Sequence, residues 1–573
     1  MRKKLSPLLI FLLFFFFSFW LMFHTFSYDP NTHTILIARK LWSDFGAHIP
    51  LIRSFSMGDN FNLLRQGKPQ YPLYPGEKMR YHFVFYALVG LLERVGLPLD
   101  WALNLPSILG FFTLLLFLFL IARMLFKDVR VAILSIIFFL FNGSLAFLQF
   151  FRDHPLSRAT FTDILHVSEF PAFAPWGPGD VSAFWNLNIY TNQRHLAVGF
   201  AIALGFILTV LHIDKNISFA KATGLAKLKL QWAILWGVVI GLLPYLHTPT
   251  VVIMAVLFIS YFLLFGNVRR FLLVSGAIAS ILVIPQLLSF PQGPTSIRWY
   301  PGYLIHDELT LPRFLLYWWQ NLGLHSILIP IGFIFIPSRA KKTLLPVVPI
   351  FLIGNLFQFS VEVAANHKFF NFALILGNMV SAYTIVSIGK HLHLSLLRVK
   401  SRNLFLFFIG SIGNIGSICL LVVLLSLSGI IDFFVVWNDQ KGGIADVGNS
   451  DVATWIARNT PTNAVFLNSS FLYPPANLAG RKIFLGWPYF AWSAGYQGNR
   501  HETMKTIYES KDSSIFCPLL KSNSIDYVTV ENTEGDPNLP AIDVAYFLKN
   551  YSPAYINEKK TYAIYTTNAL CTP

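Results

Sequence analysis

The sequence predicts a polytopic α-helical membrane protein with a small C-terminal α/β domain outside the membrane. Two observations carry this prediction. The 573 residues are 54% hydrophobic and only 13% charged, whereas soluble domains carry about 25% charged residues. Uncharged apolar runs such as LLIFLLFFFFSFWLMF at residues 8–23 recur up to residue 431, and runs of about 18 or more apolar residues are typical of membrane-spanning helices.

We expect about eleven spans, with the N-terminus inside and the C-terminus outside. Their approximate bounds are residues 6–26, 104–125, 131–150, 195–213, 231–247, 250–266, 271–290, 314–336, 344–361, 370–389 and 404–431. Every loop that this count places inside is basic, as the positive-inside rule requires. Residues 82–98 are apolar but short, and Glu93 and Arg94 interrupt them. We interpret them as an interfacial helix, because counting them as a span would move the later basic loops outside.

The net charge of +16 comes from these short basic loops, since the chain has no soluble basic domain. Binding to nucleic acid is therefore not expected. The basic residues before the first apolar run could begin a signal peptide. The run is long, however, and no Ala-x-Ala site follows it, so an uncleaved membrane anchor is the favoured interpretation.

The expected organisation is a transmembrane domain at residues 1–435, with a large first outer loop at 27–103, followed by an extracytoplasmic α/β domain at 436–573. In this tail, DVATWIARN and HETMKTIYES are predicted to be helical. AVFLNSS, RKIFLG, IDYVTV and KTYAIYTT are predicted to be strands. Such an alternation of strands and helices is typical of a small α/β domain.

Three cysteines occur in the chain. Cys419 lies in an apolar run and is expected to pack as a small apolar side chain. Cys517 and Cys571 both lie in the tail, where an oxidising compartment would allow a disulfide, although two free thiols are nearly as well supported. The aromatic segment GWPYFAWSAGY is expected to be packed or interfacial, with contact to lipid headgroups or a glycan as the alternative.

The first outer loop differs from the spans around it because it carries many ionisable residues. Asp44 is the candidate that we place first, as a catalytic base. A carboxylate at the outer end of a helical bundle can accept a proton from an incoming hydroxyl group. The competing interpretation is that Asp44 pairs with a loop arginine and stabilises the loop, which is the default role of a single aspartate.

Further candidates for substrate binding lie on the same predicted side of the membrane. They are His48, Glu77, His82, Arg194, His195, Arg298, His367 and Lys368. The basic pairs that open two of the spans could hold a phosphate or anchor their helices by snorkelling. His48 follows Asp44 by one helical turn and either orients it or only shares its face. Glu77 fits a surface charge better than a metal ligand.

Acidic residues also crowd the second outer loop, residues 151–194. Asp153, Asp163, Glu169 and Asp180 could bind a divalent cation or a sugar there. Their spacing matches no standard metal site. The sequence therefore requires no cofactor, keeps a divalent cation possible and defines no set of metal ligands.

Three segments follow one another in an order that a known family shares. WSDFGAHIPLIRSFSMG holds Asp44, YPLYPGEKMRYHFVFYALVGLLERVGL joins a Pro-rich approach to the interfacial helix, and LNLPSILGFFTLLLFLFLIARMLF follows with Leu105-Pro106-Ser107 and Arg123. In this order they resemble the GT-C superfamily of polytopic glycosyltransferases, in its protein O-mannosyltransferase and lipid A aminoarabinose transferase branch. The tail segments TWIARNTPTNAVFLN and LAGRKIFLG resemble the outer domain that closes many bacterial members. Members often carry an Asp-Glu pair, but here Phe45 follows Asp44.

The resemblance implies an inverting glycosyltransferase that moves a hexose or pentose from a polyprenyl-phosphate donor, with Asp44 as general base. The acceptor would be a lipid, a protein or a cell-envelope glycan. A glycosidase needs a second carboxylate to protonate its leaving alcohol, whereas a lipid phosphate leaves readily once cations stabilise it. The expected location is the plasma (inner) membrane, among membrane lipids, with the active site and the tail extracytoplasmic.

Two other classes of protein stay open. One is a transporter or flippase of a lipid-linked glycan, which is expected to carry buried ionisable residues or broken helices near the middle of the membrane. The sequence places its charges at the ends of spans and shows no related halves. The other is a non-catalytic envelope scaffold, which would leave the acidic first loop without a role.

Overall fold

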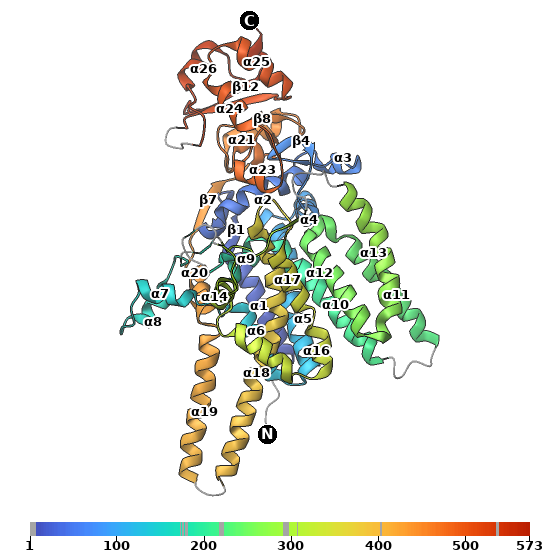
Figure 1. Cartoon of the computed structure of the whole chain (residues 1–573). Helices are drawn as coiled ribbons and strands as arrows, with labels where there is room; N and C mark the ends of the chain where they lie inside the picture. Colours follow the sequence, from blue (N-terminus) through green and yellow to red (C-terminus); the bar gives the residue numbers. More distant parts are fainter. Residues whose placement is uncertain are drawn as a thin grey trace. The chain divides into compact units, whose positions relative to one another are not determined.

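The computed structural model describes residues 7–171, 173–174, 177, 181–216, 223–289, 297–305, 308–400, 404–533 and 538–572. The chain forms two compact units, shown in Figure 1. Unit 1 comprises the described parts of Met1–Leu21, Ser107–Pro285 and Ile297–Asp439. Unit 2 comprises those of Met22–Pro106, Gln286–Ser296 and Gln440–Pro573. Unit 2 thus combines the first outer loop with the tail.

Unit 1 is helical. Three of its helices, α1, α5 and α13, continue into unit 2 at one end. In chain order the helices are α1 (Pro7–Thr25), α5 (Leu99–Phe126), α6 (Val129–Leu140), α7 (Ala146–Asp153), α8 (Thr160–His166), α9 (Asn188–Asn192), α10 (Arg194–Asn216), α11 (Thr223–Gly241), α12 (Leu243–Leu264), α13 (Arg269–Ser289), α14 (Leu311–Leu322), α15 (His325–Phe335), α16 (Ser338–Leu344), α17 (Val347–Leu356), α18 (His367–Lys400), α19 (Leu404–Leu424) and α20 (Leu427–Trp437). Helix α18 packs against α6, α15, α17 and α19 and forms the centre of this unit (Figure 1).

Six of the described helices are long and apolar enough to cross a membrane, or seven if the bent pair α19 and α20 counts as one span. This identifies the chain as an integral membrane protein. Five of the predicted spans correspond to single long helices, namely α1, α5, α10, α13 and α18. The predicted interfacial segment is α4 (Val84–Arg94), which at 1.5 Å per residue is about 16 Å long and too short to cross the bilayer.

Several apolar runs that we expected to be continuous spans are interrupted or short. Residues 131–150 form α6 and α7, residues 314–336 form α14 and α15, and residues 344–361 hold the ten-residue α17. Residues 404–431 hold α19 and the start of α20, with a bend of 56° between their apolar parts. The composition of these runs is apolar, so hydropathy alone does not reveal the breaks.

The breaks in α6, α14 and α19 pack against one another through glycines. A side chain on Gly143, Gly323 or Gly429 would clash with a neighbouring segment, so the backbones approach closely there. Gly429 N donates a hydrogen bond to Asn142 O at 3.0 Å. A helix can be interrupted inside an apolar bundle only if the freed backbone groups find such partners, and this contact supplies one.

Unit 2 begins with strands β1 (Phe26–Asp29) and β2 (Thr34–Ala38), which form an antiparallel sheet with β7 (Lys441–Ala445) from the tail. After β2 come α2 (Trp42–Ser56), α3 (Asn60–Arg65), the hairpin β3 (Gln70–Tyr71) and β4 (Tyr74–Lys78), and α4. The helices α2 and α4 pack together. Because β2 pairs with β7 along five residues, the first loop and the tail share one sheet.

The rest of the tail folds around a five-stranded sheet in the order β11-β12-β10-β8-β9. Its strands are β8 (Val465–Leu467), β9 (Lys482–Ile483), β10 (Tyr527–Glu531), β11 (Tyr555–Ile556) and β12 (Tyr562–Thr566). Its helices are α21 (Asp451–Asn459), α22 (Pro475–Leu478), α23 (Pro488–Ser493), α24 (Arg500–Glu509), α25 (Ser513–Ser522), α26 (Val544–Asn550) and α27 (Thr567–Cys571). The two helices and four strands predicted for the tail are confirmed, and β11 is an additional strand.

Two of the three cysteines form a disulfide, and the third is a free thiol. Cys517 and Cys571 form a disulfide that joins α25 to α27, which decides between the two alternatives left open by the sequence. The expectation for Cys419 was wrong, because this thiol is free and exposed on α19. Helix α19 is apolar along its length, so a small residue that faces outward is indistinguishable by hydropathy from one that is packed.

A buried ion-pair cluster stabilises unit 2. Arg53 of α2 contacts Asp446 at 2.6 Å, just after β7, and Glu93 of α4 at 3.3 Å, and its side chain is only 6% exposed. Burial by itself would lower the pKa of Arg53, but the two carboxylates reverse this effect and raise the pKa above its usual value. Two separate elements of unit 2 therefore depend on this one arginine.

Candidate functional site

One group of candidate residues lies on α2 in unit 2, with Asp44 as its acidic member. Asp44 occupies the first turn of this helix, where a carboxylate interacts favourably with the helix dipole, and it is half-buried. Burial raises the pKa of Tyr81, Tyr86 and Tyr473, and the negative charge of Asp44 raises each of them further. The Asp44 carboxylate therefore lies beside three tyrosine side chains.

Two of the predicted histidines belong to the same aromatic cluster. His48, one turn after Asp44, is buried with its ring 4.9 Å from the ring of Tyr86. The ring of His82 stacks on Tyr81 at 4.1 Å. Asp44, His48 and His82 thus share the tyrosines around them. Hydroxyl and imidazole groups at this spacing can bind a polar ligand and relay a proton.

Position 45, where many members of the resembling family carry the second acidic residue, is part of the apolar core here. The Phe45 side chain is fully buried, and its ring lies 5.2 Å from the ring of Phe26. The position faces the core of unit 2, so a carboxylate would be out of place there. Asp44 is consequently the acidic residue of this helical turn.

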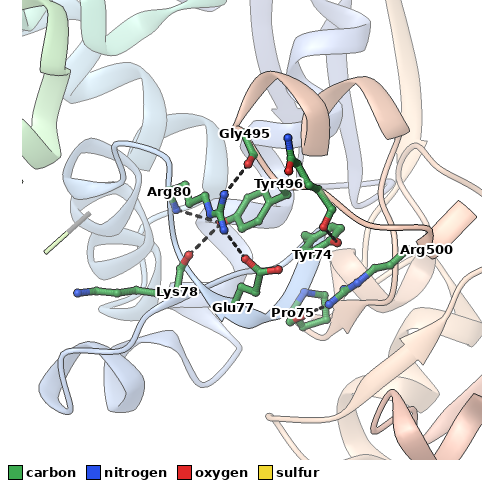
Figure 2. A network of polar contacts seen from close by, with 9 residues as sticks. Tyr74, Pro75, Glu77, Lys78, Arg80, Gly495, Tyr496 and Arg500 are labelled. Atoms are coloured by element: carbon green, nitrogen blue, oxygen red, sulfur yellow. Dashed lines mark hydrogen bonds and ion pairs between the residues drawn. The ribbon is translucent and has the colours of Figure 1, made fainter. Parts of the chain in front are cut away.

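Glu77 and Arg80 belong to a network that joins the β4 segment to the tail (Figure 2). Glu77 pairs with Arg80 at 2.7 Å. Arg80 also donates to Gly495 O and lies over the ring of Tyr496 at 4.9 Å. Arg500 lies over the ring of Tyr74 at 3.6 Å. These contacts give Glu77 a structural role within unit 2, which agrees with the interpretation as a charge and not a metal ligand.

A second group of candidate residues, which are basic, lies in unit 1 at the N-termini of α10 and α18. Arg194 and His195 open α10 and are buried. Gln193 Nε2 lies 3.5 Å from Nε2 of His367, the first residue of α18. The ring of His195 lies 5.4 Å from that of His247. Two basic pairs that are far apart in the sequence therefore meet in one place.

This cluster suits a negatively charged group. Lys368 follows His367 in the first turn of α18 and is half-buried. The first turns of α10 and α18 carry the partial positive charge of a helix N-terminus, which favours phosphate. Three buried atoms, Asn192 Oδ1, Gln193 Oε1 and His367 Nδ1, make no hydrogen bond within the described part of the chain. They are available to hydroxyl groups of a ligand.

An apolar cavity of about 520 Å³ lies between α14, α15, α17 and α18. Aromatic side chains such as Trp318, Trp319 and Phe351 line much of it. Helix α18 contributes Phe370 and Leu374, which follow the basic pair at its N-terminus by one to two turns. Unit 1 thus places an apolar cavity directly after His367 and Lys368 on one helix.

The remaining candidates lie elsewhere. Arg298 is exposed on β5 (Arg298–Trp299), which pairs with β6 (Phe357–Gln358). Asp153 lies on α7 and Asp163 on α8, whereas Asp180 lies outside the described residues. Within the described part of the chain, no group of three or more His, Cys, Asp or Glu side chains is placed to hold a metal ion.

The sequence analysis missed one buried acidic residue. Asp432 of α20 is 2% exposed and accepts a hydrogen bond from Asn142 Nδ2 at 2.9 Å. Asn142 stands at the break after α6, so the pair joins two of the interrupted helices. The available signal was a polar residue beside a glycine, Asn142-Gly143, inside an apolar run.

Solved structures of known proteins include some that are similar to this chain, and two of them are described here. No protein-family model matches the chain, and no curated protein matches its sequence. The crystal structure of ArnT from Cupriavidus metallidurans bound to undecaprenyl phosphate is similar with a TM-score of 0.49 and 12% identity over 99% of each chain. The Archaeoglobus fulgidus oligosaccharyltransferase in the apo form is similar with a TM-score of 0.43 and 15% identity, over 92% of this chain and 70% of that one.

Both TM-scores lie below 0.5, at 12–15% identity, so neither a family nor a function is taken from these similarities. We therefore derive the function from the residues themselves.

Proposed function

We propose that the protein is an inverting glycosyltransferase that takes a hexose or pentose from a polyprenyl-phosphate donor. Asp44 is the general base, and the basic cluster at the N-termini of α10 and α18 holds the donor phosphate. The acceptor is a hydroxyl-bearing lipid, protein or cell-envelope glycan. We place the reaction at the outer face of the plasma (inner) membrane, in keeping with the basic loops that the sequence predicts to be inside.

The observation that carries this proposal is the order of groups along α18. His367 and Lys368 stand in its first turn, and the side chains that follow line the apolar cavity of about 520 Å³. A polyprenyl-phosphate sugar has the same order of groups, with an anionic phosphate followed by a hydrocarbon chain. Burial of the chain supplies affinity in proportion to its apolar area, and the cations fix the head.

The chemistry needs one proton acceptor. The Asp44 carboxylate takes the proton from the acceptor hydroxyl as its oxygen bonds to the anomeric carbon of the sugar. The bond between that carbon and the phosphate oxygen breaks, and the polyprenyl phosphate leaves with the electron pair. The configuration at the anomeric carbon is inverted, because attack and departure occur on opposite faces. Cations stabilise the leaving phosphate, so no second carboxylate is required.

The basic cluster can be tested by binding alone. We expect Lys368→Gln to weaken the affinity for undecaprenyl phosphate by about tenfold or more, since a hydrogen bond to a charged group contributes about 1.5–3 kcal/mol. Microscale thermophoresis of purified protein in nanodiscs would measure this. Lys341→Gln on α16, an exposed lysine, is the matched control. Equal affinity in wild type and Lys368→Gln would remove the phosphate-binding role.

A flippase of a lipid-linked glycan is the second candidate function, and a specific feature of unit 1 favours it. The sequence placed all charges at the ends of spans, but Asp432 is buried beside interrupted helices, as transporters often show. Reconstituted vesicles with a radiolabelled polyprenyl-phosphate sugar separate the two functions. Translocation without any sugar transfer supports the flippase, and transfer that depends on Asp44 supports the enzyme.

A further inference from the structure

Three aromatic side chains form an exposed face on α23 in unit 2. Trp487 and Trp492 are 36% and 47% exposed. The ring of Tyr489 lies between them, 5.5 Å from Trp487 and 5.8 Å from Trp492. We call these three residues the α23 aromatic face. Exposed tryptophans cost free energy in water, so an uncovered pair on a short helix indicates a surface that binds something.

The α23 aromatic face is fixed at both ends. Before the helix, Gly486 N donates to Leu73 O at 2.9 Å. After it, Gly495 accepts from Arg80, and Tyr496 accepts from the Arg80 backbone N at 3.0 Å, as part of the network in Figure 2. A surface whose backbone is held on both sides loses little conformational freedom when a ligand binds. Such pre-organisation suits a binding site.

The chemistry of the surroundings favours a saccharide as occupant. A membrane-facing surface carries exposed aliphatic residues, as α4 does with Leu88, Leu91 and Val95. Among the described residues from 440 to 573, the exposed large apolar residues are Trp487, Trp492 and Ile515. The face therefore lacks the aliphatic residues of an anchor and consists of flat aromatic rings, which match the C–H face of a pyranose.

Polar side chains follow these rings in the sequence. The segment that follows α23 exposes Gln497 and Asn499, whose amides can both donate and accept hydrogen bonds. The cations of this region, Arg80 and Arg500, are occupied by Glu77, backbone carbonyls and tyrosine rings. Both guanidinium groups therefore already have partners within unit 2, and the amides of Gln497 and Asn499 suit the hydroxyl groups of a ligand.

Helix α23 packs directly on the helix that carries Asp44. A Cβ atom added at Gly46 would lie 3.7 Å from Cε2 of Phe490, so these two helices touch two residues after Asp44. Tyr473, whose hydroxyl donates to Trp42 O, also interacts electrostatically with Asp44. A sugar stacked on the α23 aromatic face would thus be held by the same packed group of elements as the proposed base.

We propose that the α23 aromatic face binds a saccharide ring of the acceptor, stacked on Trp487 and Trp492. The acceptor is then a glycan or a molecule with a glycan head, and not an unglycosylated lipid or peptide. That the bound saccharide is the acceptor rests on the proposed function. Binding of the saccharide itself needs no sugar transfer and can be measured alone.

An oligosaccharide array probed with the purified full-length chain tests the proposal. We expect wild type to retain a subset of glycans, and the double variant Trp487→Ala/Trp492→Ala to lose them. For the best glycan, calorimetry should show an affinity about tenfold lower or more, because each lost aromatic contact contributes about 0.5–1.5 kcal/mol. Trp492→Phe should keep part of the affinity, and Ile515→Ala should keep all of it.

The outcomes are separable from those of the transfer assay. Asp44→Asn should bind the glycan as wild type does while it transfers no sugar. If wild type transfers no sugar but its glycan binding depends on the two tryptophans, the proposed function fails and the saccharide site stands. If no array glycan binds, or if the double variant binds equally well, the saccharide site is refuted. Unchanged glycan binding with weaker binding to phosphatidylglycerol vesicles would assign the face to the membrane.

Discussion

Replacing Asp44 by asparagine is expected to lower the rate of sugar transfer by about 10²–10⁴-fold, the usual contribution of a positioned general base. Asparagine keeps the shape and the helix-capping ability of aspartate but cannot accept a proton. Because Asp44 is half-buried in the first turn of α2, the fold should tolerate the change. The measurement is transfer of radiolabelled sugar from a polyprenyl phosphate by purified protein in nanodiscs.

Asp29→Asn provides the matched control. Asp29 lies in the same loop, is half-buried and accepts a hydrogen bond from Thr32, so its replacement should leave transfer within about twofold of wild type. Binding of the donor lipid should be unchanged in both variants. Full transfer by Asp44→Asn would exclude this carboxylate as the base and would leave the fold assignment intact.

Replacing Arg53 by methionine is expected to destabilise unit 2 by about 3–5 kcal/mol, the cost of leaving buried charges without their partner. The carboxylates of Asp446 and Glu93 would both remain buried after the change, since their side chains are only 6% and 12% exposed. Urea unfolding of the purified protein, followed by tryptophan fluorescence, would measure the loss.

Two further variants make this result specific. Arg65→Met removes an exposed arginine of α3 in the same unit and should change stability by less than about 0.5 kcal/mol. The triple variant Arg53→Met/Glu93→Leu/Asp446→Leu removes all three charges and should recover most of the lost stability. A stable Arg53→Met single variant would show that the cluster contributes little to the fold.

Local patterns in the sequence predicted local structure well. The period of α2 placed His48 one turn after Asp44, and the structure has both on that helix. Alternating apolar residues predicted β10 and β12. The outer ends of α10 and α18 were predicted as basic, and the chemistry that binds phosphate follows from residue type alone.

Long-range packing was beyond a single sequence. Gln193 and His367 meet across 174 positions, and no periodicity reports such a contact. Strand β7 reads KGGIA, whose glycines suggest a loop, but pairing with β2 makes it a strand. The breaks near Gly143 and Gly429 depend on close backbone approach, which hydropathy does not measure.

The sheet shared by β2 and β7 sets an order of events during synthesis. Asp446 is 393 positions after Arg53, so the segment that bears Asp44 leaves the ribosome long before its partners. At about 5–20 residues per second the wait is roughly 20–80 s. Throughout that time the first loop of the new chain would lack its β7 partner strand and its ion pair with Asp446, and would be open to proteases. Protease should cut the first loop of ribosome-bound chains stalled before Asp446, whereas chains stalled well after Asp446 should resist. Equal cutting of both would show that β7 and Asp446 do not protect the first loop.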